Sequence, residues 1–277
     1  MYRVISKCLM AAALLLAAYS CGDAEKDSAT ELYNQSEAAI EQRNYTGALE
    51  LLDTLNARYP GQTAIRRQAL VLRARAMEGI AIDSIEVVSA QLAAATIAVD
   101  SLTPEFAHQA PAAAGIDGYW LPKGVSRNVM GTTGIQARVT DDGYAMIVAN
   151  VQGREIGLRA IELKDGSQSC RSETIAPALV VSVRGSESAS FRSELIAAFG
   201  PWLAEHPGAN KVVLVGSRGN ASFALTPALR KELRQCFAFA SATQAKRNAS
   251  IRREKFERML ATARDQIANL ATTESNE

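Results

Sequence analysis

Residues 135–163 read IQARVT-DDG-YAMIVANV-QGR-EIGLRAIEL, three short runs rich in β-branched and apolar residues with turn residues between them. Asp141-Asp142-Gly143 is a hairpin signal, and Gln152-Gly153-Arg154 is a second, less specific one. Runs of this length suit strands, and loops this short suit antiparallel neighbours. The stretch therefore predicts three antiparallel strands joined by hairpins.

Strand-like runs continue beyond this stretch and are again short and bounded by turn residues. An antiparallel β domain of six or so strands is therefore predicted over residues 116–225. Near its start, Tyr119-Trp120-Leu121-Pro122 fits either an edge strand or a plug that packs on the core. The other runs are 178–183, 211–216 and 221–225, and the other turns are Lys164-Asp165-Gly166 and 217–220.

One helix is predicted inside this β domain. Residues 187–205 place Phe191, Leu195 and Trp202 at helical spacing, and His206-Pro207-Gly208 ends the pattern. A helix that covers the apolar face of an antiparallel sheet gives the fold class α+β.

The region before the β domain, residues 30–103, has the 3.6-residue period of helices. Breaks at 44–47, at 59–61 and after Gly79 divide it into four predicted helices. The alanine- and proline-rich stretch 104–115 then predicts a linker.

The first two of these helices resemble a tetratricopeptide repeat over about one repeat unit. In that family a small residue lets the two helices approach, and an aromatic residue in the turn closes the pair. The resemblance implies an N-terminal helical array whose groove holds a peptide or protein. The other interpretation is a spacer that packs on its own chain, because such repeats normally need about three units. The positions that carry the resemblance are Leu32, Ser36, Tyr45, Ala48, Leu52, Leu55 and Pro60.

Residues 226–271 predict one long C-terminal helix, with Thr226 as N-cap and Pro227 at the first helical position. Residues 226–270 hold ten basic and four acidic residues, whereas 21–60 hold three basic and eight acidic ones. Three interpretations are open: the two segments attract each other, the basic face meets lipid phosphates, or the face is only solvated. Nucleic acid is disfavoured as a partner because the basic helix lacks interleaved aromatic residues.

The first twenty residues, 1–20, are predicted to be a signal peptide. Arg3 and Lys7 form a short positive region. Residues 8–19 form an apolar run that is too short to span a membrane as a helix. The chain is therefore expected outside the cytoplasm.

Cys21 directly follows small residues at the end of this run, which resembles the lipobox of bacterial lipoproteins. Ala18 stands where leucine is usual, as the looser lipoboxes of Bacteroidota permit. The resemblance implies that the Cys21 thiol is acylated, which anchors the chain in the envelope, in the outer membrane. Residues 21–29 then form a flexible tether. The other interpretation is ordinary cleavage that leaves a soluble periplasmic protein.

Few residues point to chemistry. Cys170 and Cys236 are the two cysteines left after processing, and they either form a disulfide or are two buried thiols. His108 and His206 lack the spacing of metal ligands, and Ser217 is not in a GxSxG motif. We therefore predict no catalytic residue, no metal and no cofactor.

The whole arrangement resembles lipoproteins of gut Bacteroidota, and this resemblance implies no particular activity. The predicted function is a membrane-anchored protein-binding or scaffold module, with the lipid bilayer and a protein as partners. One alternative is an envelope hydrolase or accessory factor, which predicts carboxylates of raised pKa converging in a concave site on the β domain. The other alternative is a purely structural spacer.

Overall fold

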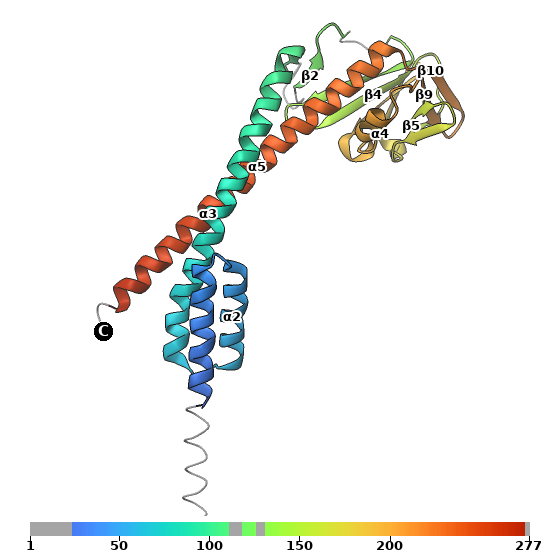
Figure 1. Ribbon diagram of the computed structural model, residues 1–277. Coiled ribbons are helices and arrows are strands. Elements are labelled where there is room, and N and C mark those ends of the chain that lie inside the picture. Colours follow the sequence, from blue (N-terminus) through green and yellow to red (C-terminus); the bar gives the residue numbers. More distant parts are fainter. Residues whose placement is uncertain (1–23, 111–117, 126–130, 275–277) are drawn as a thin grey trace, which may run out of the picture. The chain divides into compact units, whose positions relative to one another are not determined.

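The computed structural model describes residues 24–110, 118–125 and 131–274 (Figure 1). The predicted signal peptide, 1–20, and the predicted lipidation residue, Cys21, lie outside the described residues. The fold class is mixed helix and sheet with antiparallel strands and a long C-terminal helix, as predicted.

The chain divides into two compact units. The helical unit holds described residues 24–90 and 250–274, and the β unit holds Gln91–Ala249. Two long helices, α3 (Thr63–Leu102) and α5 (Pro227–Glu274), contribute residues to both units.

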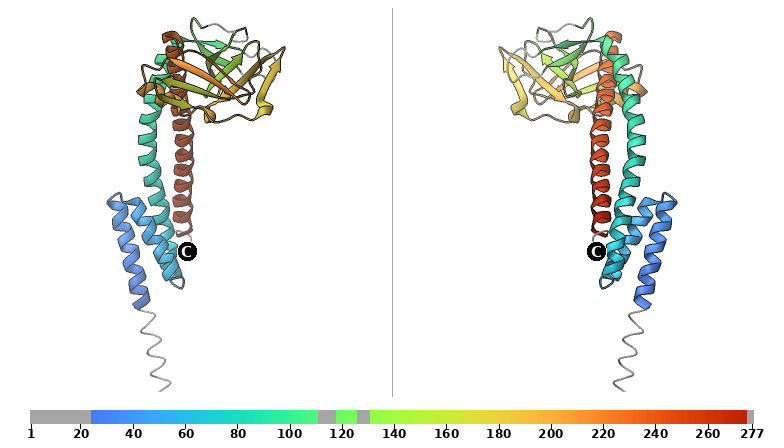
Figure 2. Two further views of the ribbon diagram at one scale, coloured as in Figure 1. Left: turned by 90° about the vertical axis from the view of Figure 1, so that its right-hand side faces the viewer. Right: turned by 90° about the vertical axis from the view of Figure 1, so that its left-hand side faces the viewer.

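The helical unit begins with a helix over 24–41, which is followed by α2 (Tyr45–Arg58) and the first part of α3. Both views in Figure 2 show the first helix and α2 as neighbours. Asn44 caps α2, because its side-chain oxygen accepts a hydrogen bond from the Gly47 N–H at 3.1 Å. The core of this unit is Leu52, Leu55, Ala69 and Leu72, with Leu32, Tyr33, Ile40 and Ile65 packed around it.

The first helix includes residues that the sequence predicted to be a tether. Residues 24–29 are helical, and Ala29 is fully buried. Thr30 does not start the helix; its hydroxyl donates to the carbonyl oxygen of Lys26, one turn earlier, at 2.8 Å. The alanine, glutamate and lysine that made this stretch look like a solvated tether are also strong helix formers.

This region holds three helices and not the four predicted, because α3 continues through Gly79. Glycine inside a helix costs about 1 kcal/mol relative to alanine, so its presence here needs a reason. A Cβ built on Gly79 would lie 2.3 Å from the ring of Tyr45. The Tyr45 ring therefore packs directly on the backbone of α3, and Gly79 is a contact position rather than a helix breaker.

The residues that carry the repeat resemblance form a helical hairpin. Ser36 is buried without an unsatisfied hydroxyl, because it donates to the carbonyl oxygen of Leu32 at 2.7 Å. Pro60 lies in the turn after α2, where its carbonyl accepts from Arg66 at 2.9 Å. The fully buried members are Ser36, Ala48, Leu52 and Leu55.

The β unit contains two antiparallel sheets. Sheet A has six strands in the order β1-β2-β3-β4-β8-β7, and sheet B has four in the order β10-β9-β5-β6 (Figure 1). In sheet A the strands are β1 (Phe106–Gln109), β2 (Tyr119–Pro122), β3 (Gly134–Thr140), β4 (Ala145–Val151), β7 (Val180–Val183) and β8 (Ser186–Arg192). In sheet B they are β5 (Leu158–Asp165), β6 (Gln168–Arg171), β9 (Lys211–Gly216) and β10 (Asn220–Ala224).

Most predicted hairpins are confirmed, but one is wrong. The Asp141-Asp142-Gly143 turn joins β3 to β4, the Asp165-Gly166 turn joins β5 to β6, and β9 pairs with β10. The turn at Gln152-Gly153-Arg154 does not fold β5 back on β4. Instead β5 pairs with β6 and β9 in sheet B, and β8 takes the place beside β4.

A buried carboxylate at Glu187 accompanies this separation of β4 from β5. Glu187 is 2% exposed and lies on β8, in sheet A. Its two oxygens accept hydrogen bonds from the backbone N–H groups of Ile156, Gly157 and Leu158, at 2.9 to 3.1 Å. Arg218 adds a contact at 3.2 Å. The carboxylate therefore satisfies the irregular backbone where the chain leaves sheet A and enters sheet B.

The helix predicted over 187–205 is wrong in its first half. Residues up to Arg192 form β8, a 3-10 turn spans Ser193–Leu195, and only α4 (Phe199–Glu205) is α-helical. In β8 the buried residues alternate, which is the period of a strand. Phe191 fits the period of a helix as well as that of a strand. The segment forms a strand because it pairs with β4 along one edge.

The linker predicted over 104–115 is also wrong in part. Residues 106–109 form β1, an edge strand of sheet A that pairs with β2. Phe106 is buried and stacks on Phe239 of α5 with 4.4 Å between ring centroids. The segment Tyr119–Pro122 is thus an inner strand, paired with β1 and β3, and not an edge.

The C-terminal helix is confirmed. Thr226 accepts a hydrogen bond from the Leu229 N–H at 3.2 Å, as an N-cap does. In the β unit, Leu233 and Phe239 of α5 are part of the core. In the helical unit, Arg264 pairs with Glu78 of α3 at 2.9 Å, a partner outside the acidic segment 21–60.

Candidate binding groove

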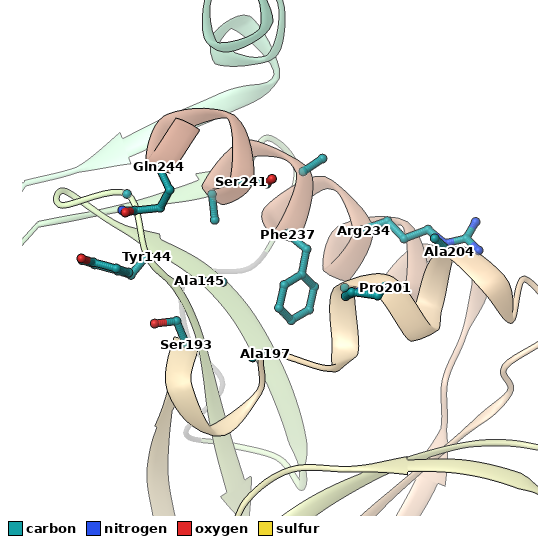
Figure 3. A pocket seen from close by; sticks show the side chains of 14 residues that line it. Tyr144, Ala145, Ser193, Ala197, Pro201, Ala204, Arg234, Phe237, Ser241 and Gln244 are labelled. Carbon is teal, nitrogen blue, oxygen red and sulfur yellow. The ribbon is translucent and has the colours of Figure 1, made fainter. Parts of the chain in front are cut away.

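An open groove of about 720 Å³ lies in the β unit, between α4, α5 and the turn that joins β3 to β4 (Figure 3). The ring of Phe237 points into it from α5. Small side chains surround this ring, and hydroxyl and amide groups gather toward one end of the groove. The polar residues at that end are Tyr144, Ser193, Ser241 and Gln244.

Small residues line the groove on both sides. Ala197, Gly200 and Ala204 line it from the α4 side, and Ala238 and Ser241 line it from α5. A Cβ on Gly200 would lie 3.4 Å from the Phe237 side chain, so this glycine packs on the ring from α5. The groove is therefore bounded on both sides by short side chains.

The turn between β3 and β4 is fixed against α5. A Cβ on Gly143, which has a φ of +81°, would lie 2.4 Å from the Thr243 side chain. Gln244 donates to the Asp142 carbonyl at 2.8 Å, and Arg247 pairs with the Asp142 carboxylate at 3.3 Å. This end of the groove is preformed by contacts between a tight turn and a helix.

The other end is fixed by Arg234. Its Nε donates to the carbonyl oxygen of Leu203 at 3.1 Å, and its Nη2 bonds to the same atom. Leu203 lies in the last turn of α4, where carbonyls lack partners within the helix. Arg234 thus caps α4 and lies beside the groove as its charged residue.

Two smaller hollows lie next to the groove, beside strands of sheet A. The first, about 450 Å³, shares Tyr144, Ala145 and Ser193 with the groove. The second, about 350 Å³, shares Arg192 and Glu194 with the first. The three hollows therefore adjoin one another through shared lining residues, and the last of them lies beside β7.

Glu232 is the second buried carboxylate of the β unit. Its residue is 9% exposed, and one oxygen accepts from the Ala137 N–H at 3.0 Å. Burial raises the pKa of Glu232 to about 7, although the hydrogen bond from Ala137 opposes this shift. Glu232 does not line the groove. The raised-pKa carboxylate is therefore not placed where the hydrolase alternative expects it.

The possible disulfide between Cys170 and Cys236 is not formed, and His108 has structural partners. Cys170 and Cys236 are free thiols, and burial raises the pKa of both; the nearby Glu232 also raises that of Cys236. His108 contacts Asp141, with Nε2 and Oδ1 2.7 Å apart, and packs on Trp120.

The remaining residues considered for chemistry lie in turns. The His206 Nδ1 lies 2.9 Å from the Trp202 carbonyl oxygen, at the end of α4. Ser217 lies in the β9–β10 turn, where its N–H donates to the Gly157 carbonyl at 2.9 Å. Among the residues that the structure describes, no group of three or more His, Cys, Asp or Glu is arranged to hold a metal ion. By length and composition alone, Thr63–Glu105 would be able to cross a membrane, a property that core helices share.

Sequence reasoning missed the groove because it joined β8 and α4 into one helix. The spacing of Ala197, Gly200 and Ala204 was visible, but small residues at this spacing are equally common in buried helix contacts. The position of these residues opposite Phe237 follows from the packing of α4 on α5, which no local pattern contains.

Comparison with protein-family models, with curated proteins and with solved structures found no match for this chain.

Proposed function

We propose that this protein is a non-catalytic binding module of the bacterial envelope, anchored through an acylated Cys21, whose groove holds an apolar stretch of a partner polypeptide. The groove between α4 and α5 is the observation that carries this proposal. Pockets lined by apolar groups with a few polar groups at one end are typical of binding sites.

A polypeptide suits the groove because of the small residues in its walls. The short side chains of Ala204 and Ala238 leave room for another backbone, whose side chains would fill the space around Phe237. The polar groups of Ser193 and Gln244 lie at one end of the groove. A backbone buried there needs hydrogen-bond partners of this kind. Recognition of this kind relies on apolar anchors with polar groups at the rim.

In this proposal the β unit binds the partner, and the helical unit has no binding role. The apolar residues of the repeat-like hairpin, among them Leu52 and Leu55, are buried in the core of that unit. This supports the spacer interpretation of the hairpin. The tetratricopeptide-like assignment remains part of the proposal and rests on the seven positions named above.

Groove occupancy is tested by filling the groove. A photoreactive benzoylphenylalanine at Ser241, in intact cells, is expected to form a specific adduct with a partner protein. Ala238→Trp fills the groove and is expected to abolish the adduct, whereas Ala245→Trp, on an exposed residue of the same helix outside the groove, keeps it. The proposal would be contradicted by an adduct that persists in Ala238→Trp. It would also be contradicted if the same adduct forms when benzoylphenylalanine is placed at Lys211 instead of Ser241.

The anchor is tested separately. Cys21→Ser is expected to move the protein from the detergent phase to the soluble fraction, because stable anchoring needs more than one acyl chain and all depend on this thiol. Partition of the variant with membranes would show that the lipid is not the anchor.

A further inference from the structure

Sheet A ends at β7, and no described strand pairs with its outer side. β7 and β8 are joined by the two-residue loop Arg184-Gly185, in which both residues have positive φ, and Val183 pairs with Ser186. Such loops are closed by a hydrogen-bonded pair. The edge strand is therefore held in a fixed register by a tight hairpin.

This register determines which backbone groups of β7 point outward. Because hydrogen bonding alternates along an antiparallel ladder, Val183 and Val181 bond toward β8. Val180 and Ser182 consequently direct their N–H and C=O groups away from the sheet. These groups need an external partner, which is water or another extended backbone.

One face of β7 carries exposed apolar side chains. Val181 and Val183 are each 59% exposed, and Leu179, just before the strand, is 61% exposed. Natural edge strands are usually protected by charges, proline or a bulge within the strand. Residues 180–183 have neither a charge nor a proline, and their pairing with β8 is regular.

We propose that β7 pairs antiparallel with an extended segment of a partner polypeptide that is apolar at alternate positions and acidic at the end beside Arg184. The inference rests on the proposed function and names the conformation of its partner. Three observations support this occupant. The outward backbone groups match the hydrogen-bonding pattern of an extended chain, Arg184 is the charged residue of the hairpin loop, and Leu179, Val181 and Leu195 line a hollow beside the strand.

A second copy of the chain fits this edge less well. Pairing of β7 with itself joins four residues on each side. A stable interface engages roughly 20–30 residues a side, so the edge alone is too small for a homodimer. A partner segment that also fills the hollow lined by Leu179 and Leu195 has a larger contact surface than the edge alone.

The test uses the full-length chain and a fluorescent heptapeptide, acetyl-EVTVSVT, as the probe. In antiparallel pairing its N-terminal glutamate lies beside Arg184. Saturable binding measured by fluorescence anisotropy is expected, and the same peptide methylated at every internal amide is expected to bind at least tenfold more weakly. Equal binding of the methylated peptide, or no saturable binding of the parent peptide, would overturn the proposal.

A matched pair of variants locates the site. Ser182→Pro removes an outward N–H without touching the ladder to β8, which edge strands tolerate. We expect it to weaken binding at least tenfold, whereas Ser182→Thr, which keeps the N–H, stays within twofold of the native chain. Circular dichroism checks that each variant is folded. If Ser182→Pro does not fold, the comparison of the methylated and parent peptides on the native chain tests the proposal. If Ser182→Pro binds normally while Ala238→Trp loses its cellular adduct, this inference fails and the proposed function stands.

Discussion

The two units of the molecule bury different chemistry. Among the residues described, the helical unit buries one polar side chain, Ser36, which bonds to its own helix. The β unit buries five: Gln136, Asn150, Ser172, Glu187 and Glu232. Four of these accept from or donate to backbone groups of other segments.

The difference follows from where backbone hydrogen bonds are made. A helix satisfies its N–H and C=O groups within itself, so helices need only apolar contact with one another. Sheets leave unpaired groups wherever a strand ends, shifts or changes sheet, and buried side chains must satisfy them. The helical unit is therefore sensitive to side-chain volume, and the β unit to the loss of buried acceptors.

The largest expected effect is at Glu187. Glu187→Gln replaces one accepting oxygen with a donor that faces backbone N–H groups, and it removes the partner of Arg218. We expect a loss of about 3 kcal/mol in the free energy of unfolding, measured by urea denaturation. Glu155→Gln, which removes the exposed second partner of Arg218, is expected to cost less than about 1 kcal/mol. Equal costs would show that the backbone bonds of Glu187 contribute little.

The next effect is at Gly79 and tests the helical unit. Gly79→Ala gains about 1 kcal/mol of helix propensity but places a Cβ 2.3 Å from the Tyr45 ring. We expect net destabilisation of about 2 kcal/mol, because overpacking of this kind costs more than the propensity returns. In a Tyr45→Ala background the same change is expected to stabilise.

A glycine in the turn between α2 and α3 provides a control for this position. Gly61→Ala meets nothing within 4 Å and is expected to be near neutral. If Gly79→Ala stabilises the chain with Tyr45 present, the Tyr45 ring does not pack closely on the α3 backbone at Gly79.

Glu232 gives the β unit a dependence on pH. The pKa of Glu232 is about 7 in the folded chain and about 4.5 in the unfolded one, so the folded state holds the proton more tightly. Stability from this group is present below about pH 4.5 and is lost as pH rises to about 7. We expect Glu232→Gln to flatten this dependence and to be more stable than the native chain by about 2 kcal/mol at pH 8.

Unfolding free energies measured from pH 4 to pH 8 check this expectation. Glu105→Gln is the control and is expected to keep the native pH profile, because Glu105 is an exposed carboxylate, which accepts a hydrogen bond from Gln235 of α5. A native chain that gains stability between pH 5 and 7 would contradict the raised pKa of Glu232.

The smallest expected effect is in the β7–β8 loop. Arg184 has a φ of +50°, which is unfavourable for a residue with a long side chain. Arg184→Asn is expected to stabilise by about 0.5 kcal/mol, because Asn-Gly is the preferred pair for such loops. Gly185→Ala, at a φ of +75°, is expected to destabilise by about 1 kcal/mol. Thermal denaturation compares the two, and stabilisation by both would argue against this loop geometry.

The sequence predicted elements well where their signal was local. The C-terminal helix was recognisable from Thr226-Pro227 and the absence of later helix breakers, and the β3–β4 hairpin from Asp141-Asp142-Gly143. The prediction failed where two patterns overlapped. Phe191 fits a strand and a helix, and Gly79 looks like a helix end unless the Tyr45 ring is known to lie on it.

The sequence by itself determined the types of most elements and the positions of most turns, because helix period, strand period and turn chemistry are each encoded within a few neighbouring residues. Only the tertiary structure decided that β5 leaves sheet A, that Glu187 is buried and that α4 and α5 enclose a groove. Glu187 and the backbone groups that it binds are 29 to 31 residues apart in the chain. Such a contact exists only after the backbone has folded, so no local sequence pattern predicts it.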